Sequence, residues 1–331
     1  MTILEEDIRK AEEIINEQNN RSKTYTQFDR LYPFTNENIK GILNRLNLYN
    51  KKCLTVLGSG DQTLDMCLNG SNNITAFDVN RLAKYYYDLK KAALLANITL
   101  DQYLDYFCYY NYLQYTEINR IALHPDTFSK ICIFLNEDSY KFWCFLYKEY
   151  HPLRVRNGNS LFLPDELKHN ILKQTINYLN NETNFYTLKE KIKDLKFEFI
   201  HNDVNNLPHF LTKQYDFIYL SNIIQYIDQM YSNICDDNNI NQIHKLQKFK
   251  DLINQLSQNL NQDGTIIIGY IFYIINNVKT NAIFNKENRE IVFNNNEFTY
   301  LYIDAIEKFK RKVFYRQDIN VSDSCLIYTK K

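Results

Sequence analysis

The stretch from Cys53 to Asn80 constrains the fold more than any other part of the chain. It begins with a short apolar run of strand length, Cys53 to Leu57, and continues directly into Gly58-Ser59-Gly60. Glycine lets the backbone turn tightly and brings backbone N–H groups close to a ligand. The pattern therefore predicts a buried strand followed by a glycine turn.

A helix and a second strand are predicted after the glycine turn. The helical residues run to Asn69-Gly70, a typical helix end, and Ile74 to Phe77 forms a strand that ends at Asp78. In doubly wound folds, an acid at the carboxyl end of this strand can accept both hydroxyls of a ribose. The stretch therefore predicts half of a nucleoside-binding site.

The glycine turn also narrows the kind of ligand. It lacks the third glycine of the dinucleotide fingerprint, and Asp61 follows it directly. A carboxylate here repels a pyrophosphate but suits a cationic ligand, so a sulfonium or an amino-acid nucleoside is favoured over NAD or ATP. The alternative interpretation is an ordinary strand-turn-helix connection, since Gly-x-Gly alone is a weak signal.

Several segments together resemble one family. Residues 56–65, VLGSGDQTLD, with Phe77-Asp78-Val79-Asn80, look like the S-adenosylmethionine site of the DUF3419 family. The similarity continues in Tyr25-Thr26-Gln27-Phe28-Asp29 upstream and in Leu220-Ser221-Asn222-Ile223 downstream. The resemblance covers most of the chain in order. That family includes the 3-amino-3-carboxypropyl transferases of betaine-lipid synthesis.

The resemblance implies a class I methyltransferase-like fold and a set of cofactor contacts. The glycine turn is expected to hold the amino-acid part of S-adenosylmethionine, Asp78 the ribose and Asp203 the adenine. The expected cofactor-binding residues are Gly58, Ser59, Gly60, Asp61, Asp78, Val79, Asn80, Asn202, Asp203, Ser221 and Asn222. Asn202, Asp203, Ser221 and Asn222 follow the predicted third and fourth strands, where ligands bind in such sheets.

The catalytic group is left open by the sequence. The sulfonium is already activated, so alignment of the acceptor can supply much of the acceleration. Tyr25, Asp61 and Tyr226 are unranked candidates for a base. The leading hypothesis is transfer of a 3-amino-3-carboxypropyl group to a lipid or small-molecule acceptor. Methyl transfer to a small molecule and a noncatalytic cofactor-binding protein are the alternatives.

Composition and charge limit the other function classes. The chain has 331 residues, 45% of them hydrophobic and 15% aromatic, as expected for a folded globular protein. Lys and Arg number 39 and Asp and Glu also number 39, so no net field attracts a polyanion and nucleic acid is disfavoured as a partner. The sequence does not determine the oligomeric state.

The cysteines and the apolar runs predict a cytoplasmic protein. The seven cysteines include no Cys-x-x-Cys pair and do not cluster with histidine, so neither structural zinc nor a disulfide framework is expected. The acidic start at Glu5-Glu6-Asp7 is unlike a signal peptide, and the run from Ile266 to Ile275 is too short to span a bilayer. Peripheral membrane contact stays open.

The predicted fold class is α/β, with a Rossmann-like sheet interrupted by helices. Residues 1–50 form an N-terminal helical arm that begins with a capping box at Thr2 to Glu5. The resemblance implies that its segment Thr24 to Phe34 forms one wall over the ligand. Residues 51–98 and 196–331 form the cofactor-binding domain, and residues 99–195 form a helical insertion that covers the acceptor region. Its aromatic residues are expected mainly in the core. Near the C-terminus, Tyr300 to Phe309 is expected to be helical, and Val313 to Arg316 to pair with Ser324 to Thr329.

Overall fold

The computed structural model describes residues 1–16, 28–108, 122–152, 155, 160–163, 169–222, 239–269, 284–285, 290–291, 298–301 and 325–330. The chain divides into two compact units, each built from several segments. The sheet unit comprises Glu37–Val56, Asn69–Phe77 and Lys196–Lys331, and the helical unit comprises Met1–Asn36, Leu57–Leu68 and Asp78–Leu195.

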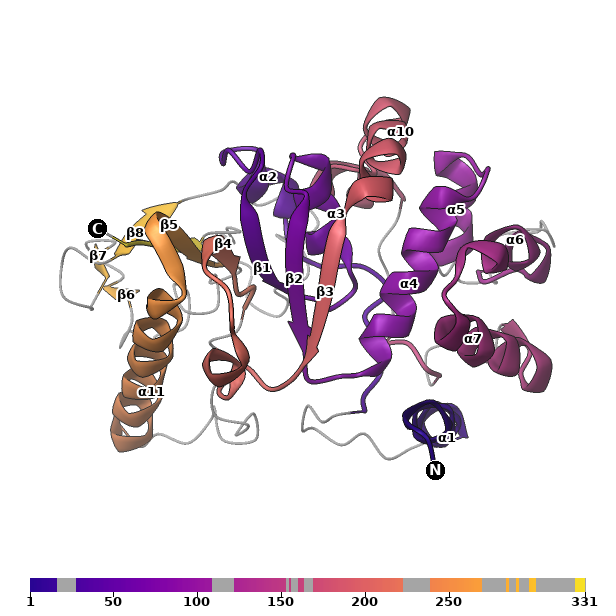
Figure 1. Cartoon of the computed structure of the whole chain (residues 1–331), viewed down its shortest axis with the longest axis horizontal. Coiled ribbons are helices and arrows are strands. Elements are labelled where there is room, and N and C mark those ends of the chain that lie inside the picture. Colours follow the sequence, from indigo (N-terminus) through magenta and orange to yellow (C-terminus); the bar gives the residue numbers. More distant parts are fainter. Residues whose placement is uncertain are drawn as a thin grey trace, which may run out of the picture. The chain divides into compact units, whose positions relative to one another are not determined.

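The main sheet contains seven strands in the order β3-β2-β1-β4-β5-β9-β8 (Figure 1). β1 is parallel to β2 and β4, β4 is parallel to β5, and β9 is antiparallel to both β5 and β8. The bounds are β1 Lys52–Val56, β2 Asn73–Asp78, β3 Lys196–His201, β4 Tyr215–Tyr219, β5 Leu260–Ile268, β8 Phe298–Leu301 and β9 Cys325–Thr329. This order, with its reversed β9, confirms the predicted α/β, class I methyltransferase-like sheet.

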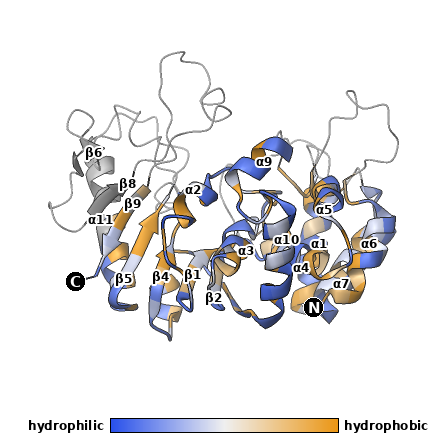
Figure 2. Cartoon of the chain, turned by 90° about the horizontal axis from the view of Figure 1, so that it is seen from above, coloured by the Kyte–Doolittle hydropathy of each residue, from blue (hydrophilic) through white to orange (hydrophobic). Residues whose placement is uncertain are grey.

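Buried aliphatic and aromatic side chains form the core of the sheet unit. Leu54 of β1, Ile218 of β4 and Ile266 of β5 are each fully buried. They belong to a cluster that also contains Phe249 and Leu256 of the helix α11, Asn239–Gln258. Figure 2 shows hydrophobic colour most clearly on β4. Near-continuous apolar strands are expected where a parallel sheet is buried on both faces.

The smaller elements of the sheet unit are short. They are α2 Ile39–Leu43, the 3₁₀ turn η4 Leu207–Phe210, and the strands β6 Phe284–Asn285 and β7 Glu290–Ile291, which pair antiparallel. The helix α2 begins after Asn38, whose side chain accepts a hydrogen bond from the backbone N–H of Gly41 at 2.9 Å. An Asn cap satisfies a donor that the first helical turn cannot pair.

The C-terminal prediction was wrong at one element. Tyr300 and Leu301 belong to the strand β8, not to a helix, and Tyr300 pairs with Leu326 of β9. The aromatic and β-branched composition of Phe298–Leu301 suits a strand, and pairing with distant β9 decides the outcome. The expected pairing segment Val313 to Arg316 lies outside the described residues. The strand predicted at Ser324 to Thr329 is present as β9.

The helical unit is built around the long helix α4, Leu82–Leu95 (Figure 1). α4 packs against α6, α7 and α10, and the N-terminal helix α1 packs against α7. The bounds of the other helices are α1 Ile3–Asn16, α3 Asp61–Leu68, α5 Leu100–Phe107, α6 Pro125–Ile131, η2 Cys132–Phe134, α7 Glu137–Glu149, α9 His169–Thr175, α10 Glu182–Lys191 and η3 Ile192–Asp194.

Local predictions in this unit are confirmed. Thr2 and Glu5 form the expected capping box, with Thr2 N donating to Glu5 Oε2 at 2.7 Å and Glu5 N donating to Thr2 Oγ1 at 3.2 Å. The described aromatic residues of the insertion are largely core, since Tyr103, Phe107 and Trp143 are fully buried. Within the described ranges, none of the helices combines the length and hydropathy that a membrane-spanning segment requires.

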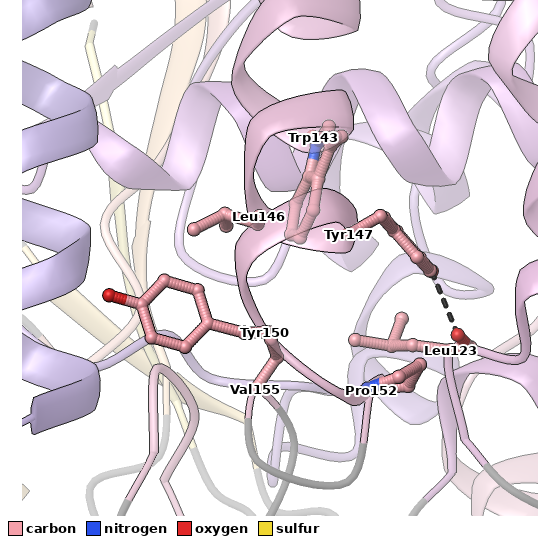
Figure 3. A pocket seen from close by; sticks show the side chains of 7 residues that line it. All are labelled: Leu123, Trp143, Leu146, Tyr147, Tyr150, Pro152 and Val155. Atoms are coloured by element: carbon pink, nitrogen blue, oxygen red, sulfur yellow. Dashed lines mark hydrogen bonds between the residues drawn. The ribbon is translucent and has the colours of Figure 1, made fainter.

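Aromatic side chains of α7 also line a small apolar pocket (Figure 3). Trp143 and Tyr147 lie on α7, Tyr150 follows it, and Leu123 closes the opposite side. The hydroxyl of Tyr147 donates to the backbone oxygen of Leu123 at 2.9 Å, and Trp143 Nε1 donates to the backbone oxygen of Tyr85 at 2.9 Å. The polar ends of two of these rings are thus satisfied by backbone, which leaves an apolar lining.

Candidate functional site

The two glycines of the turn after β1 serve different purposes. Both adopt the left-handed backbone region, with φ of +51° at Gly58 and +85° at Gly60. A Cβ at Gly60 would lie 3.0 Å from Tyr87 Cδ2, so this position is closely packed against α4. A Cβ at Gly58 would meet no atom within 4 Å. The turn therefore leaves open space beside Gly58, where a ligand can approach the backbone.

The carboxylate of Asp78 lies next to this open space. Asp78 Oδ2 accepts the backbone N–H of Gly58 at 2.8 Å, and Oδ1 accepts that of Asn80 at 2.8 Å. Burial raises the pKa of Asp78 to about 6, although the N–H groups of Asn80, Gly58 and Val79 act in the opposite direction. A carboxylate has about four acceptor positions, so acceptor capacity remains for a ligand hydroxyl.

Asp61 is at the centre of a buried network. Its Oδ1 accepts from Lys90 Nζ at 2.7 Å and from the Tyr178 hydroxyl at 2.8 Å, and its Oδ2 accepts from Ser59 Oγ at 2.7 Å and from Thr35 N at 2.8 Å. Asp61 and Lys90 are both fully buried. The network holds Ser59, and with it the glycine turn, against α4 and the segment before α2.

This network changes the electrostatic argument drawn from the sequence. The negative charge of Asp61 is matched by Lys90, whose ammonium also lies 4.2 Å from the ring centroid of Phe34. Asp61 therefore does not present an exposed charge to a sulfonium or a pyrophosphate. Asp78 is the acid beside the open space, and no cationic side chain of the described residues forms an ion pair with it.

The segment from Phe28 to Asn36 runs between these two acids. Asn80 Nδ2 donates to the backbone oxygen of Asp29 at 2.8 Å, next to Asp78. The hydroxyl of Tyr86 donates to the backbone oxygen of Pro33 at 2.9 Å, and Thr35 N reaches Asp61. The segment thus forms a wall along the glycine turn and the Asp78 turn within the helical unit.

The N-terminal helix is fixed to the residue after the Asp78 turn. Arg81 Nη2 forms ion pairs with Glu6 Oε2 at 2.6 Å and with Asp7 Oδ1 at 2.5 Å. The Tyr85 hydroxyl donates to Asp7 Oδ2 at 2.7 Å. Burial raises the pKa of Asp7, and its hydrogen bonds with Tyr85 and Arg81 oppose that shift. The arm therefore contacts α4 directly beside the Asp78 turn.

In the sheet unit, Asn202 and Asp203 form a tight turn after β3. Asn202 Oδ1 accepts the backbone N–H of Asp203 at 2.9 Å, and Asp203 Oδ1 accepts that of Asn205 at 2.8 Å. Such side-chain bonds to the local backbone are typical of Asx turns. One oxygen of Asp203 is thus used to hold its own turn.

A buried acid that the sequence analysis did not single out lies at the end of β4. Glu37 is 2% exposed, and its carboxylate accepts hydrogen bonds from the Tyr219 hydroxyl at 2.5 Å and from Ser221 Oγ. Ser221 has φ of +54°, which is unusual for a residue other than glycine. The backbone oxygen of Ser221 accepts from Gly269 N at 2.9 Å. Glu37 therefore supports a strained turn at the carboxyl end of β4.

The predicted site residues fall into three groups. Gly58, Ser59, Gly60, Asp61, Asp78, Val79 and Asn80 are brought together in the helical unit. Asn202 and Asp203, and Ser221 and Asn222, follow β3 and β4 of the sheet unit, and their contact with a cofactor stays a prediction. Tyr25 and Tyr226, two of the three candidate bases, lie outside the described residues. The third, Asp61, has no exposed surface.

The sequence contained a signal for one of the missed residues. Lys90 stands four residues after Tyr86 and three before Ala93, so helical spacing places it on the same face as these residues. A lysine at such a position requires a buried acid as partner, and Asp61 was a candidate. Glu37 carried no comparable signal, because its partners lie 182 and 184 residues away.

Comparisons with known proteins find solved structures that resemble this chain, but they do not assign the chain to a family. No protein-family model matches the chain, and no curated protein matches it. Similar solved structures include an rRNA methylase from Streptococcus thermophilus, at 10% identity over 88% of this chain and 94% of that chain, with a TM-score of 0.35.

Two further solved structures are similar to a comparable degree. An rRNA methyltransferase from Streptomyces viridochromogenes is 12% identical over 99% of this chain and 94% of that chain, with a TM-score of 0.36. A precorrin 8W decarboxylase from Methanobacterium thermoautotrophicum is 11% identical over 92% and 97%, with a TM-score of 0.35. Similarities at this level assign no activity, and the strand order identifies the fold on its own.

Proposed function

We propose that this chain is an S-adenosylmethionine-dependent transferase and that it transfers the 3-amino-3-carboxypropyl group. The observation that carries the proposal is the arrangement of Gly58 and Asp78. Open space lies beside a left-handed glycine, and a carboxylate with unused acceptor positions is hydrogen-bonded to that glycine. A ribose that donates to Asp78 from its hydroxyls fits this donor and acceptor set.

The charge of the turn supports a sulfonium nucleoside over a nucleotide. Asp78 forms no ion pair with the described residues, so an anionic phosphate at Gly58 would be repelled by it. A nucleoside that carries a positive sulfonium has no such penalty. A phosphate site also needs several free backbone N–H groups. Two N–H groups of this turn are already used, since Gly58 N donates to Asp78 and Gly60 N donates to the Leu57 oxygen at 2.6 Å.

The residues of the chain act mainly by positioning in this proposal. When bound, S-adenosylmethionine supplies an activated leaving group at its sulfonium. The Asp61–Lys90 pair and Tyr178 hold Ser59, and Asp78 holds Gly58, so both sides of the turn are fixed before a ligand arrives. Preorganised contacts of this kind lower the entropic cost of aligning two reactants.

The choice of group rests on the resemblance to the betaine-lipid transferases. It is carried by the glycine turn, by Phe77-Asp78-Val79-Asn80 and by Leu220-Ser221-Asn222 together. On the same resemblance, Asp203 is proposed to contact the adenine, and the acceptor is proposed to be a lipid or a small molecule.

Binding of S-adenosylmethionine is tested by its effect on thermal unfolding. A ligand at about one hundred times its Kd stabilises the native state by about 2.7 kcal/mol, so the Tm of the wild-type protein should rise. Asp78→Ala should remain folded, with a lower Tm because the bonds to Gly58 and Asn80 are lost, and should lose most of the rise that the ligand causes. Asp194→Ala, which removes an exposed acid after α10, should respond like the wild type. An unchanged response in Asp78→Ala would refute the site.

The transferred group is identified by the nucleoside product. Carboxypropyl transfer leaves 5′-methylthioadenosine, whereas methyl transfer leaves S-adenosylhomocysteine. Wild-type protein is incubated with S-adenosylmethionine and candidate lipids, amines and amino acids, and the nucleosides are separated by chromatography. Methylthioadenosine that forms only with an acceptor and only with intact Asp78 supports the proposal. Accumulation of S-adenosylhomocysteine alone would replace it with methyl transfer.

A further inference from the structure

Arg30 lies on the wall between the two acids of the glycine-turn region. The residue before it, Asp29, accepts a hydrogen bond from Asn80 Nδ2 at 2.8 Å through its backbone oxygen. Five residues after it, Thr35 N donates to Asp61 at 2.8 Å. Arg30 is therefore carried by a segment that is fixed at one end to the Asp78 turn and at the other to the network that holds Ser59.

The guanidinium of Arg30 contains a buried donor that is not satisfied. Nη1 is buried and makes no hydrogen bond with any described residue. Buried polar groups in native proteins nearly always have a partner, and a charged donor without one is costly. The neighbouring Asp29 carboxylate accepts the backbone N–H of Arg30 at 2.7 Å and makes no hydrogen bond with Nη1.

The charge balance of the wall points to an anionic partner for Nη1. Burial raises the pKa of Asp29, and the charge of Arg30 lowers it, so the two side chains interact electrostatically. Among the described residues, however, Arg30 forms no ion pair, in contrast to Arg81, which pairs with two acids. The planar donors of arginine match two oxygens of a carboxylate or of a phosphate, and the unpaired charge of Asp78 disfavours a phosphate near this turn.

We infer that Arg30 binds the carboxylate of the amino-acid part of S-adenosylmethionine. The inference rests on the proposed function. Two oppositely charged residues of the helical unit then bind different parts of the ligand. Asp78 accepts hydrogen bonds from the ribose, and Arg30 binds the carboxylate. Arg30 then selects a nucleoside that carries an amino acid against one that does not, and it is a binding residue that the sequence motifs leave unassigned.

Three ligands separate this role from other roles of Arg30. S-adenosylmethionine carries the carboxylate, decarboxylated S-adenosylmethionine keeps the nucleoside and the sulfonium without it, and 5′-methylthioadenosine lacks the whole amino-acid part. Their Kd values are measured by calorimetry for the wild type, Arg30→Met, Arg30→Lys and Arg45→Met. Arg45 is an exposed arginine that follows α2, so its variant controls for loss of one positive charge.

The expected result is a selective loss. Wild-type protein should bind S-adenosylmethionine about 10- to 100-fold more tightly than the decarboxylated ligand, the range of a charge-assisted pair. Arg30→Met should lose that preference while binding methylthioadenosine like the wild type, and Arg30→Lys should retain part of it. Arg45→Met should match the wild type with all three ligands.

The failures are distinguishable. If Arg30→Met binds S-adenosylmethionine as tightly as the wild type, Arg30 does not hold the carboxylate, although the proposed function survives. If the variant weakens all three ligands equally, Arg30 only supports the fold of the wall, and the inference is again overturned. If the wild type binds neither S-adenosylmethionine nor methylthioadenosine, the proposed function itself fails.

Discussion

Asp78 should make ligand binding depend on pH in a defined window. Its pKa in the folded protein is about 6, above the value of about 3.9 expected in the unfolded chain. Between these values the folded state holds a proton that the unfolded state has lost, so this group lowers the stability as the pH rises through the window. The charged form is the better acceptor for ribose hydroxyls.

The affinity for S-adenosylmethionine is therefore expected to rise as the pH increases from 5 to 7 and then to level off. A group with this pKa is about one-tenth ionised at pH 5, so the Kd there should be about tenfold larger than its plateau value. Calorimetric titrations at several pH values measure it. Asp78→Asn, which does not titrate, should show a weak and flat profile. A wild-type profile equally flat through this range would exclude Asp78 as the responsible group.

Two substitutions of Gly58 distinguish backbone strain from loss of the space assigned to the ligand. Its φ of +51° makes alanine unfavourable by about 1–2 kcal/mol, whereas asparagine tolerates this region better. Both side chains would enter the open space that we assign to the ligand. Gly58→Asn should therefore retain more stability in urea unfolding than Gly58→Ala, yet both should lose S-adenosylmethionine binding. Wild-type affinity in either variant would place the ligand elsewhere.

Elements defined by short-range patterns could be predicted from the sequence, and elements defined by distant pairing could not. The strand, glycine turn, helix and strand from Cys53 to Asp78 are confirmed because apolar runs, two glycines and Asn69-Gly70 encode them locally. β8 was missed because Phe298–Leu301 becomes a strand through pairing with β9, about 27 residues further along the chain.

The same difference applies to the candidate site. The glycine turn and Asp78 could be predicted, since they stand at fixed positions relative to two strands. The neutralisation of Asp61 by Lys90 depends on how α3 meets α4, and the bonds from Tyr219 and Ser221 to Glu37 join residues far apart in the sequence. Charge patterns alone therefore indicated an acid near the turn but not which acid lies beside the open space at Gly58.

The ends of β4 and β5 provide a test of this long-range packing. A Cβ on Gly269 would lie 2.5 Å from the Tyr219 hydroxyl oxygen, which is too close for the two to coexist unmoved. Gly269→Ala should destabilise the protein by about 1–3 kcal/mol, the usual range for overpacking. Tyr219→Phe removes that oxygen, and with it the hydrogen bond to Glu37. The double variant should therefore cost less than the sum of the two single variants.

Urea unfolding of the four proteins measures this coupling. The control cycle combines Gly269→Ala with Tyr215→Phe, since Tyr215 lies at the other end of β4 and should add independently. Additivity within about 0.5 kcal/mol in the Tyr219 cycle would mean that the Cβ finds room without displacing the ring, and that the predicted clash does not occur.

The connectivity of the whole chain favours joint unfolding of the two units. The chain passes from one unit to the other five times, after residues 36, 56, 68, 77 and 195. β1 and β2 belong to the sheet unit, whereas the turns that follow them, with Gly58 and Asp78, belong to the helical unit. Neither unit is a continuous segment. Unfolding of one unit therefore disturbs the residues that connect it to the other unit.

We therefore expect one cooperative transition in urea, although a chain of 331 residues often unfolds through intermediates. Trp143 is the single tryptophan, is fully buried in the helical unit, and reports that unit by fluorescence. Hydrogen exchange of the β4 and β5 amides reports the sheet unit. The two probes should give the same midpoint, and saturating S-adenosylmethionine should raise both midpoints equally. A fluorescence midpoint well below that of the sheet amides would show instead that the helical unit, with Gly58 and Asp78, unfolds separately. The ligand would then raise only the fluorescence midpoint.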